Sequence, residues 1–384
     1  MTLLLDAGDY PLGQTTISGI GLRVAELAAA LAHHFPVRIY SPATGAQEPV
    51  SVGGAEVTTI AADWSNLLAD AEVVFFFDMP DPSRIQQANG AGKLIVSENA
   101  PPIEHLEYPR LRPGGVFDTV TYQRLIDTYR MQLTHSHLFT ARSHIGRVTL
   151  IANLCAYGLL RIEDLDRSRR LDHRITTIPI GYSTTTVGAH HHCGDEVGGQ
   201  RNEVLWTGGL WQFYDPAAAV RGVAAARANG IEICLRFLHA APHPDTHAVR
   251  AEITRTGLEL GIAEQVVLHT DPIRHDDRDR YLRNAAGLIC LARRGIENET
   301  SVRLRVRDSR LYGMPLLVDP FGATATELAH DGLAIAVDPD DPYTVGSYLA
   351  TLATHRTTRQ VNPEVWAYEH TTAPLVAQLR EHLK

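Results

Sequence analysis

The sequence predicts an α/β protein built from two doubly wound, Rossmann-like domains. The first observation is a short apolar strand at Leu3–Leu5, which leads through a loop to Gly19-Ile20-Gly21 and an amphipathic helix. The second is a new series of strands and helices that begins at Val204–Trp206, after a polar, glycine-rich segment. The third is the length, because 384 residues can form two domains with separate cores.

The composition is that of an ordinary acidic protein. The net charge is −9, hydrophobic residues make up 44% and aromatic residues 7%. The arginines are dispersed and there is no basic tail, so no nucleic-acid partner is indicated. The longest apolar run, Val148–Leu160, is interrupted by Asn153 and is shorter than the roughly 20 residues of a membrane span. We therefore expect a buried helix here and no stable membrane insertion.

The cysteines, the histidine cluster and the N-terminus point to a reducing, cytoplasmic location without a metal site. The four cysteines are scattered and form no C-x-x-C pair. The cluster His190-His191-His192-Cys193 is a poor metal site, since adjacent ligands on one short loop rarely complete a tetrahedron. The N-terminus lacks a basic region and is interpreted as a strand, not a signal peptide.

Two strongly apolar strands of the first half end in polar residues. Val73–Phe77 is followed by Asp78, and Leu94–Val96 is followed by Ser97-Glu98-Asn99. Open α/β sheets bind ligands beyond the carboxyl ends of their strands, so these polar residues are candidates for ligand chemistry. Each can equally be a loop-capping residue. The other strands predicted in this half are Val37–Tyr40, Val57–Ile60, Leu138–Thr140 and Ile175–Ile178.

The second half repeats the pattern. Thr207-Gly208-Gly209 forms a turn after the first strand, and Asp215-Pro216 supplies the N-cap and first residue of an alanine-rich helix. Glycines in such turns permit either close packing or close approach to a ligand, and both interpretations apply to Gly19 and Gly21. Further strands are predicted at Ile233–Leu238, Val266–Leu268, Gly287–Leu291, Leu316–Val318 and Ala334–Val337.

The stretch Glu297–Pro315 concentrates charge in one loop and one helix. Ser301 is an N-cap residue type and Gly313 is a helix stop, which predicts a helix from near Ser301 to just before Gly313. The free N–H groups of such a helix, with Arg303 and Arg305 beside them, suit a phosphate or diphosphate. The alternative is a solvated helix with ordinary surface charges.

This stretch resembles the nucleotide-sugar signature of a branch of glycosyltransferase family 4, which has the GT-B fold. The resemblance rests on an acid followed by S-x-R-x-R and then by D-x-x-x-x-G-x-P. The run L-W-T-G-G-L-W-Q-F-Y-D-P resembles the first turn of the C-terminal domain in the same branch. Most members place two glutamates eight positions apart, whereas Glu299 and Asp308 are nine apart and the second acid is shorter. Either Glu299 or Glu297 is therefore the first acid.

The resemblance implies two Rossmann-like domains that face each other across a cleft. It places an acceptor-binding domain at 1–181, a linker at 182–200, a donor-binding domain at 201–362 and, at 363–384, a C-terminal helix that crosses back to the first domain. No bound metal is required, because arginines and helix dipoles stabilise the leaving diphosphate.

The resemblance also implies roles for individual residues. Glu299 would act on the transferred sugar, and Glu98 and His105 are further catalytic candidates. Asp308 would accept hydrogen bonds from the ribose hydroxyls. The residues that would bind the diphosphate and nucleotide are Gly208, Gly209, Ser301, Arg303, Arg305, Asp308 and Thr324. The residues that would line the cleft from the first domain are Gly19, Gly21, Arg23 and Asp78.

The favoured interpretation is a retaining glycosyltransferase that uses a UDP- or GDP-sugar as co-substrate. Its alanine- and arginine-rich composition suggests a GC-rich bacterial genome. With no basic amphipathic helix for docking on lipid, we expect a small-molecule acceptor of secondary metabolism. Polysaccharide or lipopolysaccharide synthesis is the alternative. A GT-B-shaped nucleotide-sugar epimerase is a further alternative, as is a non-catalytic sugar-nucleotide-binding protein, since the acid pair is altered.

Overall fold

The chain forms two compact units. The first contains Met1–Pro102, Thr119–His192 and Pro363–Lys384, and the second contains Ile103–Asp118 and Cys193–Asn362. None of the described helices combines the length and the apolar character needed to cross a lipid bilayer. The computed structural model describes residues 2–13, 17–42, 59–60, 63–98, 101–107, 111–192, 202–241, 246–271, 273–275, 277–354 and 361–382.

The first unit contains a seven-stranded parallel sheet with the strand order β3-β2-β1-β4-β5-β6-β7. Its strands are β1 (Leu3–Asp6), β2 (Val37–Tyr40), β3 (Thr59–Ile60), β4 (Val73–Phe77), β5 (Leu94–Glu98), β6 (Leu138–Ala141) and β7 (Ile175–Thr177). The strands predicted in this half are confirmed, although positions 57, 58 and Asn99 lie outside the described residues. The strand order reverses between β1 and β4, which makes the sheet doubly wound.

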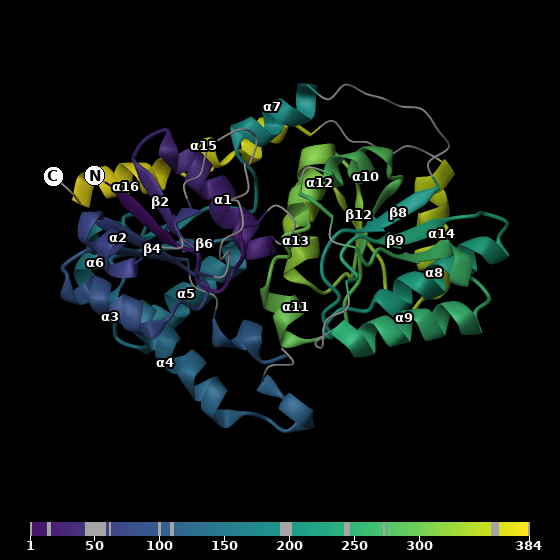
Figure 1. The fold of residues 1–384 in the computed structure, drawn as a ribbon, viewed down its shortest axis with the longest axis horizontal. Helices are drawn as coiled ribbons and strands as arrows, with labels where there is room; N and C mark the ends of the chain where they lie inside the picture. Colours follow the sequence, from purple (N-terminus) through teal and green to yellow (C-terminus); the bar gives the residue numbers. More distant parts are fainter. Residues whose placement is uncertain are drawn as a thin grey trace. The chain divides into compact units, whose positions relative to one another are not determined.

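Helices cover both faces of this sheet, because successive residues of a strand point to opposite sides. The helices concerned are α1 (Gly19–Ala32), α2 (Trp64–Asp70), α3 (Pro82–Gly90) and α16 (Ala373–His382). Phe75 and Phe77 of β4 share one core with α1 and α16, whereas Phe76 shares another with α2 and α3. Figure 1 shows these two helix pairs on opposite sides of the strands.

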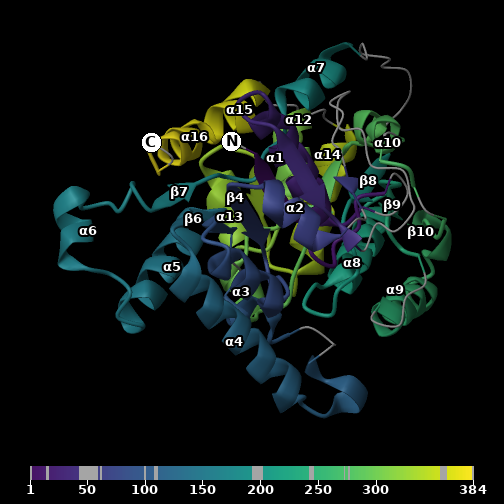
Figure 2. The same ribbon diagram turned by 60° about the vertical axis from the view of Figure 1, so that its left-hand side comes forward.

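A third core lies between β6, α4 (Thr119–His135) and α5 (His144–Ala156) and contains Phe139. Figure 2 shows α5 next to β6. The helix predicted within Val148–Leu160 is present, but the prediction that it is buried is wrong, since Val148 is 50% exposed. α5 is therefore an amphipathic helix on the surface of the first unit.

The C-terminal helices α15 (Tyr368–Thr371) and α16 belong to the first unit. The backbone N–H of Tyr368 donates to the carbonyl of Tyr182 at 2.7 Å. The Tyr368 hydroxyl accepts a hydrogen bond from the backbone of Gly181 at 3.0 Å. A Cβ atom on Gly181 would lie 2.0 Å from the Trp366 carbonyl oxygen, so a glycine is needed where the two segments meet.

Part of the predicted linker 182–200 is helical. α7 (Thr184–His192) follows α6 (Ile162–Arg167) and β7 in the chain. The Ser183 hydroxyl accepts a hydrogen bond from the backbone N–H of Thr186 at 3.3 Å, which is a helix cap. The threonine-rich sequence that indicated a loop thus includes a helix start. Residues 193–200 lie outside the described residues.

The second unit contains a six-stranded parallel sheet with the order β10-β9-β8-β11-β12-β13. Its strands are β8 (Glu203–Trp206), β9 (Cys234–Phe237), β10 (Val266–Leu268), β11 (Gly287–Cys290), β12 (Leu316–Val318) and β13 (Ala334–Ala336). Its helices are α8 (Pro216–Ala228), α9 (His247–Glu259), α10 (Arg278–Asn284), α11 (Ile296–Thr300), α12 (Val306–Tyr312), α13 (Ala323–Ala329) and α14 (Pro342–Thr354). Asp215 caps α8 as predicted, accepting a hydrogen bond from the backbone of Ala218 at 2.9 Å.

The helix predicted from Ser301 to Gly313 begins later than expected. Ser301 follows α11 instead, and its backbone N–H donates to the carbonyl of Glu297 at 2.8 Å. The prediction that Ser301 is an N-cap is therefore wrong, because this bond closes the preceding helix. The predicted stop is confirmed, since Gly313 follows α12 with a left-handed φ of 60°. Residues 301–305 form a loop between the two helices.

Candidate functional site

Arg305 and the glycine turn after β8 form the centre of the candidate site. Thr207-Gly208-Gly209 follows β8 at the carboxyl end of the second sheet. Nη2 of Arg305 donates to the Gly209 carbonyl at 2.9 Å. A Cβ atom on Gly208 would lie 2.1 Å from Nε of Arg305, so the absence of a side chain makes room for the guanidinium. The structure thus brings three predicted diphosphate-binding residues together.

Two aromatic rings flank this guanidinium. Cζ of Arg305 lies 4.7 Å from the centre of the Trp206 ring and 4.4 Å from that of Tyr214. Its Nη1 contacts the thiol of Cys290. Within the described part of the chain, no carboxylate oxygen lies within 4.0 Å of Arg305, although the residue is only 6% exposed. Arg305 is therefore a buried cation that none of the described carboxylates contacts.

Arg303 has different surroundings. Its Nη2 forms an ion pair with Asp319 at 2.8 Å and a hydrogen bond to Oδ1 of Asn298 at 2.9 Å. Its Nη1 donates to the Cys290 carbonyl at 2.9 Å, and its backbone N–H donates to Oγ1 of Thr324 at 3.0 Å. The Arg303 side chain is 1% exposed. These contacts fix the 301–305 loop to the carboxyl ends of β11 and β12 and, through Thr324, to α13.

Ser301 lies at the start of this loop. Its hydroxyl oxygen is enclosed and makes no hydrogen bond to any residue that the structure describes. Buried hydroxyls normally have a hydrogen-bond partner in the protein, in ordered water or in a ligand. Ser301 thus retains hydrogen-bonding capacity next to Arg303, but without the helix N-terminus that the sequence predicted.

Asp308, the predicted ribose-binding acid, lies in a buried ion-pair cluster. Its Oδ2 accepts a hydrogen bond from Nη2 of Arg278 at 2.8 Å, and Nη1 of Arg307 lies 3.5 Å from its Oδ1. Burial, followed by the charge of Arg278, lowers the pKa of His239 to about 3. Burial, followed by the charge of Arg307, also lowers the pKa of His275. Both histidines are therefore neutral at pH 7. Because Asp308 already accepts a hydrogen bond from Arg278, a ribose hydroxyl would compete with Arg278 for this carboxylate.

The two glutamates of α11 have different surroundings. Glu297 is 6% exposed, and its charge contributes to the raised pKa of Tyr214, for which burial is the main cause. Glu299 is exposed. Its charge contributes, after burial, to the raised pKa of Glu107. Glu297 is therefore the buried acid of the pair, and its charge acts on Tyr214.

The segment Ile103–Asp118 belongs to the second unit, although the first domain predicted from the sequence, 1–181, includes it. Oε1 of Glu107 accepts a hydrogen bond from the backbone of Ile296, the first residue of α11, at 3.0 Å. A Cβ atom on Gly295 would lie 2.3 Å from the same oxygen. His105, a predicted catalytic residue, lies in this segment and is 4% exposed, so its ring is enclosed by protein.

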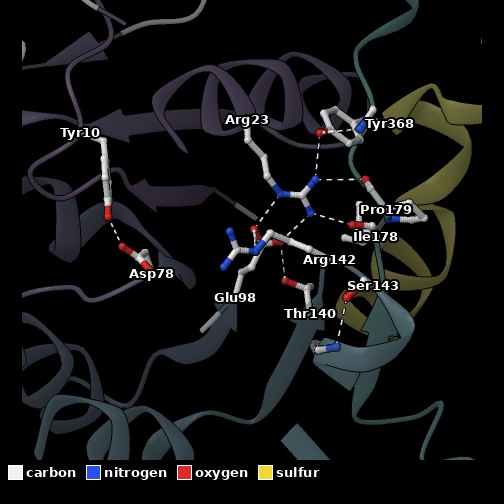
Figure 3. A network of polar contacts seen from close by, with 12 residues as sticks. Tyr10, Arg23, Asp78, Glu98, Thr140, Arg142, Ser143, Ile178, Pro179 and Tyr368 are labelled. Carbon is white, nitrogen blue, oxygen red and sulfur yellow. Dashed lines mark hydrogen bonds and ion pairs between the residues drawn. The ribbon is translucent and has the colours of Figure 1, made fainter. Parts of the chain in front are cut away.

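In the first unit, the predicted catalytic residue Glu98 is bound to the predicted cleft residue Arg23 (Figure 3). Nε of Arg23 lies 2.7 Å from Oε1 and Nη2 lies 2.6 Å from Oε2 of Glu98. Thr140 also donates to Oε2, and Arg23 donates to the Tyr368 hydroxyl at 2.8 Å. The Arg23 side chain is 0% exposed. Arg23 is therefore part of the core and does not line a ligand-facing loop.

Gly21, in the first turn of α1, is closely packed. The Ser18 hydroxyl accepts a hydrogen bond from the backbone of Gly21 at 2.9 Å and so caps α1, which begins at Gly19. A Cβ atom on Gly21 would lie 2.5 Å from the carbonyl oxygen of Pro11. The close-packing interpretation therefore explains Gly21 without a ligand.

Asp78 has an unusual backbone at the carboxyl end of β4. Its φ is 53°, a left-handed conformation that is rare for residues other than glycine and is enriched at functional sites. Its carboxylate accepts a hydrogen bond from the Tyr10 hydroxyl (Figure 3). Its backbone carbonyl accepts one from Nε2 of Gln132 at 3.0 Å. These contacts hold the Asp78 carboxylate at the carboxyl end of β4.

Three residues of the second-unit site were not identified from the sequence. Trp206 and Tyr214 flank Arg305, and Arg278 pairs with Asp308. A signal for the first two was present, because the run from Leu205 to Pro216 is rich in aromatic residues in a chain with only 7% of them. Arg278 is 30 positions before its partner, and no local pattern links the two.

No family model and no curated protein sequence matches this chain. Its structure is similar to sucrose-phosphate synthase from Thermosynechococcus elongatus, with a TM-score of 0.60 and 13% identity over 99% of this chain and 94% of that one. It is also similar to a UDP-forming α,α-trehalose-phosphate synthase from Burkholderia xenovorans in complex with glucose-6-phosphate, with a TM-score of 0.56 and 13% identity over 82% and 74%. A third similar structure is that of S. aureus MnaA with UDP, with a TM-score of 0.53 and 12% identity over 100% and 96%.

These similarities and the two parallel sheets define the fold class. The chain has the GT-B fold, with two Rossmann-like units of seven and six strands. At identities of 12–13%, these three similarities establish the fold and not the reaction.

Proposed function

We propose that this protein is a glycosyltransferase whose second unit binds a nucleoside diphosphate sugar through Arg305 and the turn Gly208-Gly209. The observation that carries the proposal is the buried Arg305 guanidinium, which has no carboxylate within 4.0 Å among the described residues. A buried charge is costly unless it is paired, and a diphosphate would supply the opposite charge. Guanidinium groups match phosphate oxygens in geometry as well as in charge.

Two further features support an anionic ligand at this position. The hydrogen bonds of Arg305 use one N–H on each terminal nitrogen, so three of its five N–H donors make none with the described residues. The turn Gly208-Gly209 has no side chains, so a ligand can approach its backbone closely. The site also lies at the carboxyl ends of parallel strands, the usual position of ligands in such sheets.

The remaining assignments extend this proposal. Glu297 is proposed, in preference to Glu299, as the acid that acts on the transferred sugar, because it is buried and its charge acts on Tyr214, which flanks Arg305. Glu98 and His105 are assigned structural roles in their enclosed environments. We propose a UDP- or GDP-sugar donor, retention of configuration and a small-molecule acceptor of bacterial secondary metabolism.

Thermal-shift measurements with UDP, GDP and their sugars test the proposal. A ligand present at about 100 times its dissociation constant stabilises the fold by about 2.7 kcal/mol. The donor that gives the largest shift is then incubated with a panel of acceptors, and glycosylated product is expected. Conversion of the donor sugar without an acceptor would instead indicate an epimerase. Binding of the donor without turnover on any acceptor would indicate a binding protein, and no shift with any nucleotide would contradict the donor site.

A further inference from the structure

We propose that Trp206 and Tyr214 are positioning residues that hold Arg305 in place while leaving its charge available to an anionic ligand. The inference rests on the proposed function, because the ligand in question is the donor diphosphate. A carboxylate could hold a buried guanidinium equally well, but it would also neutralise it. An aromatic face attracts a cation through its quadrupole without carrying a net negative charge.

The geometry supports this distinction. Cζ of Arg305 lies within 5 Å of two ring centres, at 4.7 Å from Trp206 and 4.4 Å from Tyr214. The two rings lie edge to face, with their centres 5.9 Å apart and their planes at 77°. They therefore contact the guanidinium from two directions, and together they restrict its position.

Both rings are themselves fixed by the fold. Trp206 is the last residue of β8 and is 0% exposed. Tyr214 is 7% exposed, and its backbone forms an antiparallel bridge with Ala292, just after β11. The next residue, Asp215, caps α8. The rings thus come from rigid elements, and they can transmit that rigidity to Arg305.

Arg303 provides a comparison within the same loop. It is also close to the Tyr214 ring, with its Cζ 5.2 Å from the ring centre, but its charge is paired with Asp319 at 2.8 Å. The two arginines are two residues apart in the chain, and among the described residues only Arg303 has a carboxylate partner. We therefore expect the aromatic residues to affect anion binding through Arg305 and not through Arg303.

A double-mutant cycle tests the inference, with UDP and inorganic pyrophosphate as the probes. Tyr214→Leu removes the ring face and should raise the dissociation constants about 3- to 30-fold, the range for loss of a partly buried cation–π contact. The matched control, Tyr214→Phe, keeps the ring and should bind like the wild type. In an Arg305→Ala background, Tyr214→Leu should cause no further loss. The thermal midpoint of each variant is measured in parallel to confirm that it is folded.

The outcomes separate the inference from the proposed function. Unchanged binding of both probes in Arg305→Ala would refute the donor site itself. Weakened binding in Arg305→Ala but wild-type binding in Tyr214→Leu would refute only the role of the ring. An equal loss from Tyr214→Leu in both backgrounds would also refute it, because the ring would then act independently of Arg305. Tyr214→Met, which retains apolar volume, replaces Tyr214→Leu if that variant does not fold.

Discussion

Arg23 and Glu98 form a buried ion pair through two parallel contacts of 2.7 and 2.6 Å. The pair connects α1 to the carboxyl end of β5, at a position where the sequence suggested catalysis. Both carboxylate oxygens of Glu98 accept hydrogen bonds from Arg23, and Arg23 also donates to the Tyr368 hydroxyl. The pair therefore stabilises the contacts among α1, the carboxyl end of β5 and Tyr368. Removal of the Arg23–Glu98 pair should therefore lower the stability of the fold more than the catalytic activity.

The first prediction concerns this pair. Arg23→Met removes the bidentate partner of the buried Glu98 carboxylate, whose other ion pair, with Arg142, is longer at 3.9 Å. The change should lower the free energy of unfolding by about 3–5 kcal/mol. The control is Arg38→Met, whose ion pair with Asp70 at 2.7 Å is exposed. That change should cost no more than about 1 kcal/mol. Urea denaturation monitored by circular dichroism measures both, and similar losses in the two variants would contradict the structural role of Arg23.

The second prediction concerns the turn after β8. In Gly208→Ala, the added methyl group would lie 2.1 Å from Nε of Arg305, so the guanidinium must move. We expect UDP binding to weaken about 10-fold or more, the effect of losing one charge-assisted hydrogen bond. Gly90→Ala is the control, since a Cβ atom there has no neighbour within 4 Å. Calorimetric titration checks this, and wild-type affinity in Gly208→Ala would show that the turn does not position Arg305.

The third prediction concerns pH. Burial, then the charge of Glu299, raises the pKa of Glu107 above its ordinary value. A carboxyl group with a raised pKa binds its proton more tightly in the folded state, so its ionisation destabilises the fold as the pH rises above about 4.3. Glu107→Gln cannot ionise, and its amide oxygen can still accept the hydrogen bond from Ile296. The variant should therefore match the wild type near pH 4 and exceed its thermal midpoint at pH 7.5.

Glu72 provides the control of opposite sign. A hydrogen bond from the backbone of Thr2 lowers its pKa, so Glu72→Gln should lose stability relative to the wild type as the pH rises. Thermal midpoints at pH 4 and 7.5 test both variants. If the difference between Glu107→Gln and the wild type does not grow with pH, the proposed environment of Glu107 is wrong.

The fourth prediction separates the two acids of α11. Glu297→Gln should reduce sugar transfer about 100-fold or more while leaving UDP affinity unchanged, as expected for an interaction made mainly in the transition state. Glu299 is exposed, and Glu299→Gln should retain most of the activity. Steady-state kinetics with the donor identified by thermal shift provides the measurement. The reverse pattern would assign the acid to Glu299, and full activity in both variants would exclude α11 from the chemistry.

The fold was predictable because its signals are local. Buried strands such as Val73–Phe77 are short apolar runs, and Asp215-Pro216 marks a helix start by residue type alone. The start of α12 was not predictable in this way, because Ser301 has the residue type of an N-cap but bonds back to Glu297. The choice between starting one helix and ending another depends on the tertiary contacts of Arg303, which local sequence does not show.

The candidate site was predictable in its location more than in its details. Gly208, Gly209 and Arg305 meet as expected, since motif and topology both place them at one end of the second sheet. The partners of Arg303 and Asp308 depend on long-range pairing with Asp319 and Arg278. Whether an arginine is neutralised inside the protein or available to a ligand is decided by such partners, and sequence spacing does not contain that information.

The affinity of UDP for Arg305→Ala, measured by isothermal titration calorimetry, is the most direct test of the donor site. The control is Arg293→Ala, because Arg293 is more exposed and already pairs with Glu252 at 2.8 Å. Loss of hydrogen bonds between Arg305 and the diphosphate should cost about 1.5–3 kcal/mol, or about 10- to 150-fold in the dissociation constant. Arg293→Ala should bind UDP like the wild type. If the wild type binds UDP and Arg305→Ala binds it equally well, Arg305 does not hold the diphosphate and the donor site proposed here is wrong.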